Sequence, residues 1–351
     1  MSSFDINVTT EDPGEAALVN TGGNDNRWGI RVVMTGDDFP GPGSGGVAYI
    51  GSFRWGYNQA GATDTPCYVF NVVPEQATLA VSHEVGHSLG LSHDGTNAQN
   101  PFQQNAEYYG GHGGAGETSW GPIMGAPYGR NITSWDNGFY LGSNNGGANA
   151  NYGSGPDDIA VIISPANGFG ILQDDHGNLE TSATELTGPI DASDRVVFSQ
   201  LGLIERSNDL DYFQFQAGSG TLDLLIDPYI TQAWTRTSDG SFVPSIESAL
   251  FNTNYWPATQ STNLDIEARL YDASGTLVAT SNPVGMRAGF SGLQISAGIY
   301  YLSIDGVGFG SPTNNPPDGY SDYGSIGQYL ITGSMPVAFG VAVSNASLTY
   351  V

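Results

Sequence analysis

The sequence lacks lysine: all nine basic residues among its 351 are arginine. Against them stand 35 aspartate and glutamate residues, which give a formal net charge of −26 at pH 7. Nucleic acids and anionic membranes are bound by clustered positive charge. We therefore expect no nucleic-acid partner and no binding to anionic membranes, whereas an acidic surface suits divalent cations and salty surroundings.

Cysteine and long apolar runs are also scarce. Cys67 is the only cysteine, so an intramolecular disulfide is excluded, and its apolar surroundings predict a buried thiol in a strand. The segment Met1–Phe4 has neither a basic nor an apolar stretch, so no signal peptide is predicted. No apolar run approaches the length that crosses a bilayer, so membrane insertion is not expected.

Abundant glycine and proline favour turns and short strands. The chain contains 50 glycines and 19 prolines, and its length is sufficient for two domains with real cores. Short strands bounded by Gly, Pro, Asn or Asp are predicted at Phe4–Thr10, Trp28–Thr35, Gly46–Phe53 and Cys67–Val73.

Helices are expected at two places. Pro74 and Glu75 open a predicted helix over Gln76–Leu89, because proline suits the first position and acidic charge suits the helix dipole. Gly90 ends it. Residues 95–156 are rich in loop-forming residues, and a short helix with aspartate at its N-terminal end is expected over Pro156–Ile163.

From about residue 185 the sequence alternates apolar and polar residues in strand after strand. This spacing predicts a sandwich of antiparallel sheets. The polar segment Asn167–Gly177 is typical of a linker, so domains are expected at 1–170 and 171–351. The predicted strands are Asp211–Phe215, Thr221–Ile226, Asp265–Tyr271, Gly298–Ile304 and Gln328–Thr332.

The segment His83–Asp94 reads HEVGHSLGLSHD and contains the candidate metal ligands and catalytic residue. His83 and His87 project from one helix face and can bind one metal ion, while Gly90 permits the turn that returns His93 to it. Three imidazoles leave a fourth zinc position for water, the arrangement of catalytic zinc, and Glu84 can face that water. The alternative is a surface helix that carries three histidines by chance.

The pattern H-E-x-x-H-x-x-G-x-x-H resembles the zinc motif of metzincin metalloproteases, and Asp94 is similar to the reprolysin-like branch. The resemblance implies an α+β catalytic domain, a mixed twisted sheet with an active-site helix, and Glu84 as general base. It also implies that Met124, in the run PIMGAPY, lies beneath the zinc. Ala126, Pro127 and Tyr128 would line the pocket for the residue after the scissile bond, and Gly46–Phe53 would align substrate as an added strand.

Two features depart from that family. Some metzincins place a tyrosine two positions after the methionine, as a metal ligand or an oxyanion stabiliser. Here Ala126 holds that position and Tyr128 follows two residues later, so we expect Tyr128 in the pocket wall. The family's usual first strand and long helix have no counterpart before Phe4–Thr10, which favours an N-terminally shortened chain.

The C-terminal part resembles the bacterial pre-peptidase C-terminal domain, a β-sandwich that follows many secreted proteases. The motifs are Asn208–Phe215, Leu270–Gly275 and Ala297–Leu302. Carboxylates at Asp209, Asp211, Asp305 and Asp322 suit a structural calcium ion, although no helix–loop–helix calcium motif is present and acidic turns without metal are an equal alternative.

Three further polar residues receive structural interpretations. We expect Asp94 to orient its loop by accepting hydrogen bonds rather than to touch the zinc. His112, in the run GGHGG, is expected to be exposed in a flexible loop. His176 follows Asp174 and Asp175 and is interpreted as part of a polar linker turn, with metal binding as the alternative.

Three functions remain open from the sequence. The leading hypothesis is a secreted bacterial zinc endopeptidase, a monomer that acts on protein or peptide substrates with one catalytic Zn²⁺ and a structural Ca²⁺. The second is a non-catalytic module in which the sandwich captures polysaccharide or protein beside a vestigial protease. The third is a zinc enzyme that acts on something other than peptides.

Overall fold

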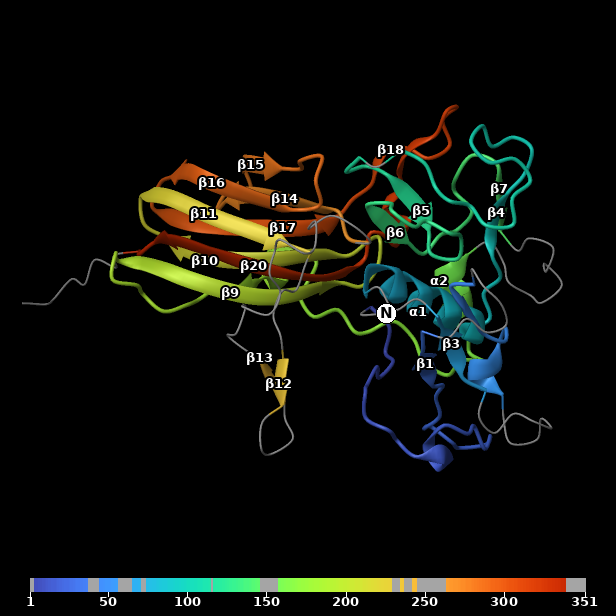
Figure 1. The fold of residues 1–351 in the computed structure, drawn as a ribbon. Helices are drawn as coiled ribbons and strands as arrows, with labels where there is room; N and C mark the ends of the chain where they lie inside the picture. Colours follow the sequence, from blue (N-terminus) through green and yellow to red (C-terminus); the bar gives the residue numbers. More distant parts are fainter. Residues whose placement is uncertain are drawn as a thin grey trace, which may run out of the picture.

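The computed structural model describes residues 3–36, 44–55, 65–70, 74–114, 116–145, 157–228, 234–236, 242–244 and 263–338. Figure 1 shows two parts side by side, with α1 (Pro74–Leu89), β1 (Val32–Met34) and β3 (Cys67–Val69) at one end and a stack of long strands at the other. No helix among the described residues is long and apolar enough to cross a membrane.

A small mixed sheet carries the predicted helix. β1 (Val32–Met34) pairs in parallel with β3 (Cys67–Val69), and β2 (Gly46–Val47) pairs antiparallel on the other side of β3. α1 (Pro74–Leu89) packs against β3 and β2. The mixed sheet and its helix agree with the sequence prediction, and Cys67 is fully buried as expected.

Three predicted strands need correction. The predicted strand Phe4–Thr10 is wrong: within that segment only Phe4 forms a bridge, to Ile171, and Val8 is 76% exposed. The strand predicted over Trp28–Thr35 shortens to β1. Gly46–Phe53 forms only β2 before the chain enters the 3₁₀ helix η2 (Ser52–Arg54). Residues 71–73 of the last predicted strand lie outside the described residues.

The loop-rich middle of the chain is organised by two short strand pairs. β4 (Asp94–Thr96) pairs antiparallel with β7 (Ser143–Asn145), and β5 (Trp120–Pro122) pairs in parallel with β6 (Ile132–Ser134). The expected second helix is present as α2 (Asp158–Ile162). Asp157 caps it, because its side chain accepts a hydrogen bond from Ala160 N.

The second part is a sandwich of two sheets, as predicted. One sheet has the order β15-β14-β17-β10-β8 and the other β16-β11-β20-β9, and almost all neighbours are antiparallel. The strands are β8 (Thr184–Glu185), β9 (Arg195–Ile204), β10 (Leu210–Ala217), β11 (Gly220–Asp227), β14 (Ile266–Asp272), β15 (Leu277–Ser281), β16 (Ala288–Ile295), β17 (Gly298–Gly306) and β20 (Gly327–Pro336).

The sandwich core follows from the period of two in these strands. In β10, Phe213, Phe215 and Ala217 are buried, while Gln214 and Gln216, which alternate with them, are not. Two peripheral pairs accompany the sheets: β12 (Trp234–Arg236) with β13 (Phe242–Pro244), and β18 (Phe309–Ser311) with β19 (Asp318–Tyr320). Short 3₁₀ helices lie at Glu15–Ala17, Glu180–Ser182 and Asp322–Gly324.

The two parts share a buried junction, which overturns one prediction. His112 was expected in solvent but is only 2% exposed. Its Nε2 lies 2.6 Å from the carbonyl oxygen of Gly319, and its Nδ1 lies 2.9 Å from the hydroxyl of Tyr109. The hydrophobic cluster beside it takes residues from both parts, namely Tyr109, Trp120, Ile132, Tyr140, Met286 and Tyr320. The domain division at 170/171 stays a prediction.

Candidate active site

Helix α1 and the turn after it bring three histidines together. His83 and His87 are one helical turn apart, and their ring centroids lie 4.7 Å from each other. Gly90 adopts φ +116°, a conformation that favours glycine, and the chain then reverses towards His93. The Nε2 atoms of His87 and His93 are 3.0 Å apart, and one ligand atom from each of the three histidines lies within 4.8 Å of the others.

Each imidazole is held through its other ring nitrogen. His83 Nδ1 lies 2.8 Å from Ile123 O, and His87 Nδ1 lies 2.9 Å from Leu91 O. His93 Nδ1 lies 3.0 Å from Glu107 Oε1. Because these partners accept hydrogen bonds, each Nδ1 carries the proton, and each Nε2 keeps a lone pair for a metal.

Burial keeps the imidazoles neutral. It lowers the pKa of His83 to about 3, with the neighbouring His87 adding to the effect. Burial likewise lowers the pKa of His87 to about 4. Zinc prefers neutral imidazole nitrogens as donors. The three histidines offer Nε2 atoms that converge, with no carboxylate among them, so they fit a zinc ion.

Glu84 lies beside the histidines and is itself buried, with 5% of its surface exposed. Its Oε2 atom has no hydrogen-bond partner, and burial raises the pKa of its carboxyl group to about 8. A Cβ atom on Gly46 of β2 would come within 2.6 Å of Glu84 Cγ. The edge of the small sheet therefore directly adjoins this carboxyl group.

Met124 lies under α1. It is fully buried, and a Cβ atom on Gly86 would meet its sulfur at 2.6 Å. Its carbonyl oxygen accepts a hydrogen bond from Asp94 N at 2.9 Å. The preceding residue, Ile123, supplies the acceptor for His83. The methionine segment is thus bonded both to His83 and to Asp94, the residue after His93.

The residues that the metzincin resemblance assigns to the substrate pocket directly follow this segment. Ala126 is half-buried and donates its N–H to Tyr109 O at 2.9 Å. Pro127 is buried against Gly121, whereas Tyr128 is 44% exposed. Their roles towards a substrate stay predictions.

The structure adds two residues that the sequence analysis missed. Glu107 accepts from His93, and the ring of Tyr108 lies 4.0 Å from the His93 ring, between centroids. Both lie in a loop fourteen or more residues beyond His93. The one available signal is a carboxylate followed by two tyrosines in an otherwise Gly- and Asn-rich stretch, since ligating histidines commonly have a carboxylate partner.

Asp94 is almost completely buried at the start of β4. Its backbone N–H donates to Met124 O and its carbonyl oxygen accepts from Tyr109 N. Burial raises the pKa of its carboxyl group, and the neighbouring Asp158 and Asp136 add to the effect. Its backbone thus ties the third-ligand loop to the methionine segment, while its Oδ2 has no hydrogen-bond partner.

The four calcium candidates separate in space. Within the part of the chain that the structure describes, one further group besides the histidines brings three ligand atoms within 4.8 Å: Asp174, Glu205 and Asp209. Asp211 is buried beside it. Asp305 and Asp322 belong to no such group, and Asp305 instead adjoins Glu267 and Arg269.

No curated protein matches the chain, whereas solved structures and one family model do. The pre-peptidase C-terminal domain of a Bacillus anthracis collagenase aligns with 45% of this chain and 99% of its own, at 12% identity and a TM-score of 0.23. A Sulfurospirillum deleyianum protein covers 40% of this chain and 98% of its own, at 10% identity and a TM-score of 0.21. Residues 9–94, which hold Glu84 and the three histidines, match the family model of the reprolysin-like metallopeptidases, M12B.

Proposed function

We propose that this chain is an extracellular zinc endopeptidase with Glu84 as its general base. One observation carries the proposal. Three neutral imidazoles converge through their Nε2 atoms, and the buried carboxyl group of the next residue after the first ligand has an oxygen with no partner. The match of residues 9–94 to a metallopeptidase family supports the same reading.

His83, His87 and His93 would hold the zinc ion. Zinc in such a site supplies a Lewis acid for the scissile carbonyl group and for a water molecule. Glu84 would remove a proton from that water and return it to the departing amine. Its dry surroundings suit this role, because burial moves the carboxyl pKa towards neutral pH, where a group both accepts and releases a proton readily.

The edge of the small sheet is the proposed substrate guide. Among the described strands, β2 lies at an edge, with β3 on its other side. A peptide added antiparallel to β2 would pass Gly46, which touches Glu84. Pro127 and Tyr128 would then wall the pocket for the residue that follows the scissile bond.

The proposal is tested by casein cleavage together with zinc stoichiometry. Glu84→Ala should retain one zinc per chain while cleavage falls at least about a hundredfold, because the proton acceptor is gone. His83→Ala, His87→Ala and His93→Ala should each lose zinc as well. Glu185→Ala, an exposed carboxylate on the sandwich, is the control and should cleave normally. Normal cleavage by Glu84→Ala would contradict the mechanism.

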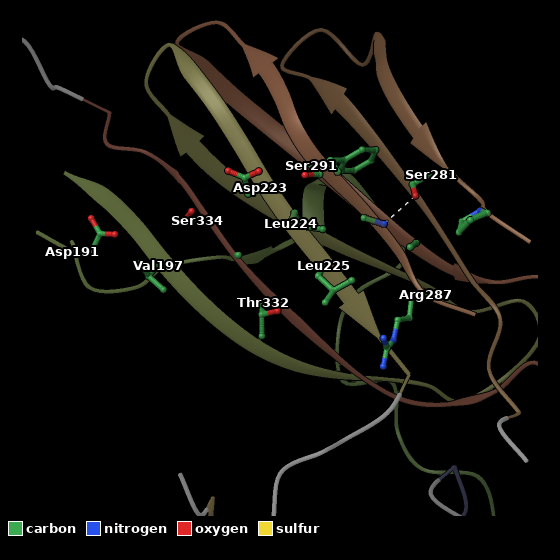
Figure 2. A pocket seen from close by; sticks show the side chains of 15 residues that line it. Asp191, Val197, Asp223, Leu224, Leu225, Ser281, Arg287, Ser291, Thr332 and Ser334 are labelled. Carbon is green, nitrogen blue, oxygen red and sulfur yellow. Dashed lines mark hydrogen bonds between the residues drawn. The ribbon is translucent and has the colours of Figure 1, made fainter. Parts of the chain in front are cut away.

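Among the described residues, a groove on the sandwich is a candidate surface for the binding-module alternative. An open groove lies on the β16-β11-β20-β9 sheet and has a volume of about 700 Å³. Figure 2 shows the side chains that line it. Val197, Leu225 and Thr332 lie along it, Asp223 lines it from β11, and Arg287 lies further along. Zinc-independent retention on a polysaccharide or protein column without casein cleavage would favour this alternative. Zinc-loaded protein that cleaves no peptide would favour the third hypothesis.

A further inference from the structure

Tyr108 lies against the candidate zinc site from a loop outside the histidine motif. Its ring centroid is 4.0 Å from that of His93 and 6.3 Å from that of His83. The planes of the Tyr108 and His83 rings meet at only 24°. Among the described residues, His87 makes ring contacts with the other two histidines but not with Tyr108. Tyr108 therefore borders the site along the side that His83 and His93 form.

The carboxyl group of Glu84, the proposed general base, is close to the same side chain. Burial raises the pKa of Tyr108, and the charges of Glu107 and Glu84 add to the effect. Charges act in this way on groups a short distance away, so the phenol of Tyr108 and the carboxyl group of Glu84 are neighbours. The region beside His83 and His93 thus holds both a carboxyl group and a phenol.

The hydroxyl of Tyr108 is available to a ligand. Tyr108 is 42% exposed, and within the described part of the chain its hydroxyl makes no hydrogen bond to a protein group. The next residue, Tyr109, is different, because it is 0% exposed and its hydroxyl lies 2.9 Å from Nδ1 of His112. Of these two neighbouring tyrosines, one belongs to the buried junction and the other offers a donor at the surface of the site.

Backbone hydrogen bonds to β4 hold the loop on both sides of Tyr108. Thr96 N donates to Ala106 O at 2.8 Å, and Tyr109 N donates to Asp94 O at 2.8 Å. Because β4 begins directly after the third histidine of the motif, these bonds fix the backbone of Tyr108 relative to the candidate zinc site. A donor that is already in place before the reaction stabilises a transition state without a cost of reorganisation.

Peptide hydrolysis requires such a donor, because negative charge develops on the scissile carbonyl oxygen. The chain has no lysine, so a cationic donor other than histidine would have to be an arginine. No arginine of the described chain is among the groups whose charge shifts the pKa values of the three histidines or of Glu84. The neutral hydroxyl of Tyr108, by contrast, lies beside both.

We infer that Tyr108 is a catalytic residue whose hydroxyl donates a hydrogen bond to the oxyanion that develops on the scissile carbonyl group. The inference rests on the proposed peptidase function. A hydrogen bond strengthens as its acceptor becomes negative, so the hydroxyl contributes more to the transition state than to the binding of substrate. The Tyr108 ring, which packs on His93, holds the hydroxyl in position.

Tyr108→Phe in the full chain isolates the hydroxyl, because the remaining ring keeps its packing on His93. For the peptide that the wild type cleaves fastest in a casein digest, kcat should fall about a hundredfold and KM should change less than about twofold. Zinc stoichiometry and Tm should equal those of the wild type. Tyr68→Phe is the matched control and should cleave normally: Tyr68 is 40% exposed, and it lies on the face of β3 opposite to Cys67, whose thiol bonds to α1.

Binding of a phosphinic peptide supplies a measurement without turnover. In this peptide a phosphinate replaces the scissile amide, so a stable tetrahedral anion stands where the oxyanion would form. Calorimetric titration should give Tyr108→Phe a Kd about a hundredfold higher than the wild type, the same factor as the loss in kcat/KM. The peptide products of cleavage, which carry no tetrahedral anion, should bind the two proteins equally.

Equal kcat, or equal affinity for the phosphinic peptide, in Tyr108→Phe and the wild type would overturn the inference. A rise in KM alone would also overturn it, since Tyr108 would then only wall the substrate site, and so would a loss of zinc, which would assign the effect to His93. If the wild type cleaves peptides and Tyr108→Phe matches it, the proposed function stands and this inference alone fails. Zinc-loaded wild type that cleaves no peptide would overturn both.

Discussion

At the scale of single residues, the three histidines of the candidate zinc site differ in how they are held. His83 and His87 bond to backbone carbonyl oxygens close to α1, whereas His93 depends on a side chain, Glu107, that is half exposed. The backbone acceptors cannot be removed by substitution. Glu107 can be replaced, so it offers the most direct test of how the imidazole rings are oriented.

We predict that Glu107→Ala weakens zinc binding about ten- to a hundredfold, because the His93 ring loses the acceptor that fixes its tautomer and orientation. Competition with a chelator of known zinc affinity measures the change. Glu107→Gln retains an acceptor and should lose less. Equal zinc affinity in Glu107→Ala and wild type would show that Tyr108 packing alone orients His93.

Asp265 offers a second test, through pH. Burial raises its pKa to about 7, from an ordinary value near 3.8, although the Tyr320 hydroxyl donates to it at 2.7 Å. The folded state thus holds the proton more tightly, so the stability falls as the pH rises from about 4 to about 7. Asp265→Asn should remove a penalty of up to about 4 kcal/mol. Urea unfolding should show a larger gain at pH 8 than at pH 5; an equal gain at both would refute the assignment.

At the scale of elements, the close packing of α1 against Met124 forms the floor of the candidate site. Alanine normally stabilises a helix interior relative to glycine by about 1 kcal/mol. At Gly86, however, a Cβ atom would collide with the Met124 sulfur and press on Leu91 Cδ1 at 3.2 Å. Packing here opposes helix propensity.

We therefore predict that Gly86→Ala destabilises the protein by about 1–3 kcal/mol despite the better helix former. Thermal unfolding measures this. Gln76→Ala, on the exposed side of the same helix, should not destabilise it. Gly86→Ala combined with Met124→Ala should recover part of the loss, and an additive loss instead would mean that the two side chains do not compete for one space.

At the scale of the whole molecule, the two parts are bonded at several places. Besides the contact of His112 with Gly319, the Tyr323 hydroxyl donates to Asp157 Oδ1 and accepts from Ile159 N at 3.1 Å. Tyr323 thus reaches from the sandwich side into α2, which packs on α1. The active-site helix is supported from the second part of the chain.

We predict that the whole chain unfolds in one cooperative transition. Tyr323→Phe should lower its Tm by about 2–6 °C, because the partly buried Ile159 N loses its acceptor and Asp157 Oδ1 loses one of its two donors. Scanning calorimetry tests both, with equal calorimetric and van't Hoff enthalpies expected. Two separate peaks, with the first alone shifted by the substitution, would show that the parts unfold independently.

The sequence by itself determined the spacing of the three histidines, the helix that carries two of them and the sandwich strands. A local motif fixes the spacing of His83, His87 and His93, and the period of two in the later strands defines a sandwich, because both depend on short-range geometry. The tertiary structure decided what long-range packing controls. It left Phe4–Thr10 without a strand, buried His112, placed Glu107 beside His93, and brought Asp174 close to Glu205 and Asp209. Those contacts link residues far apart in the chain, and no local pattern encodes them.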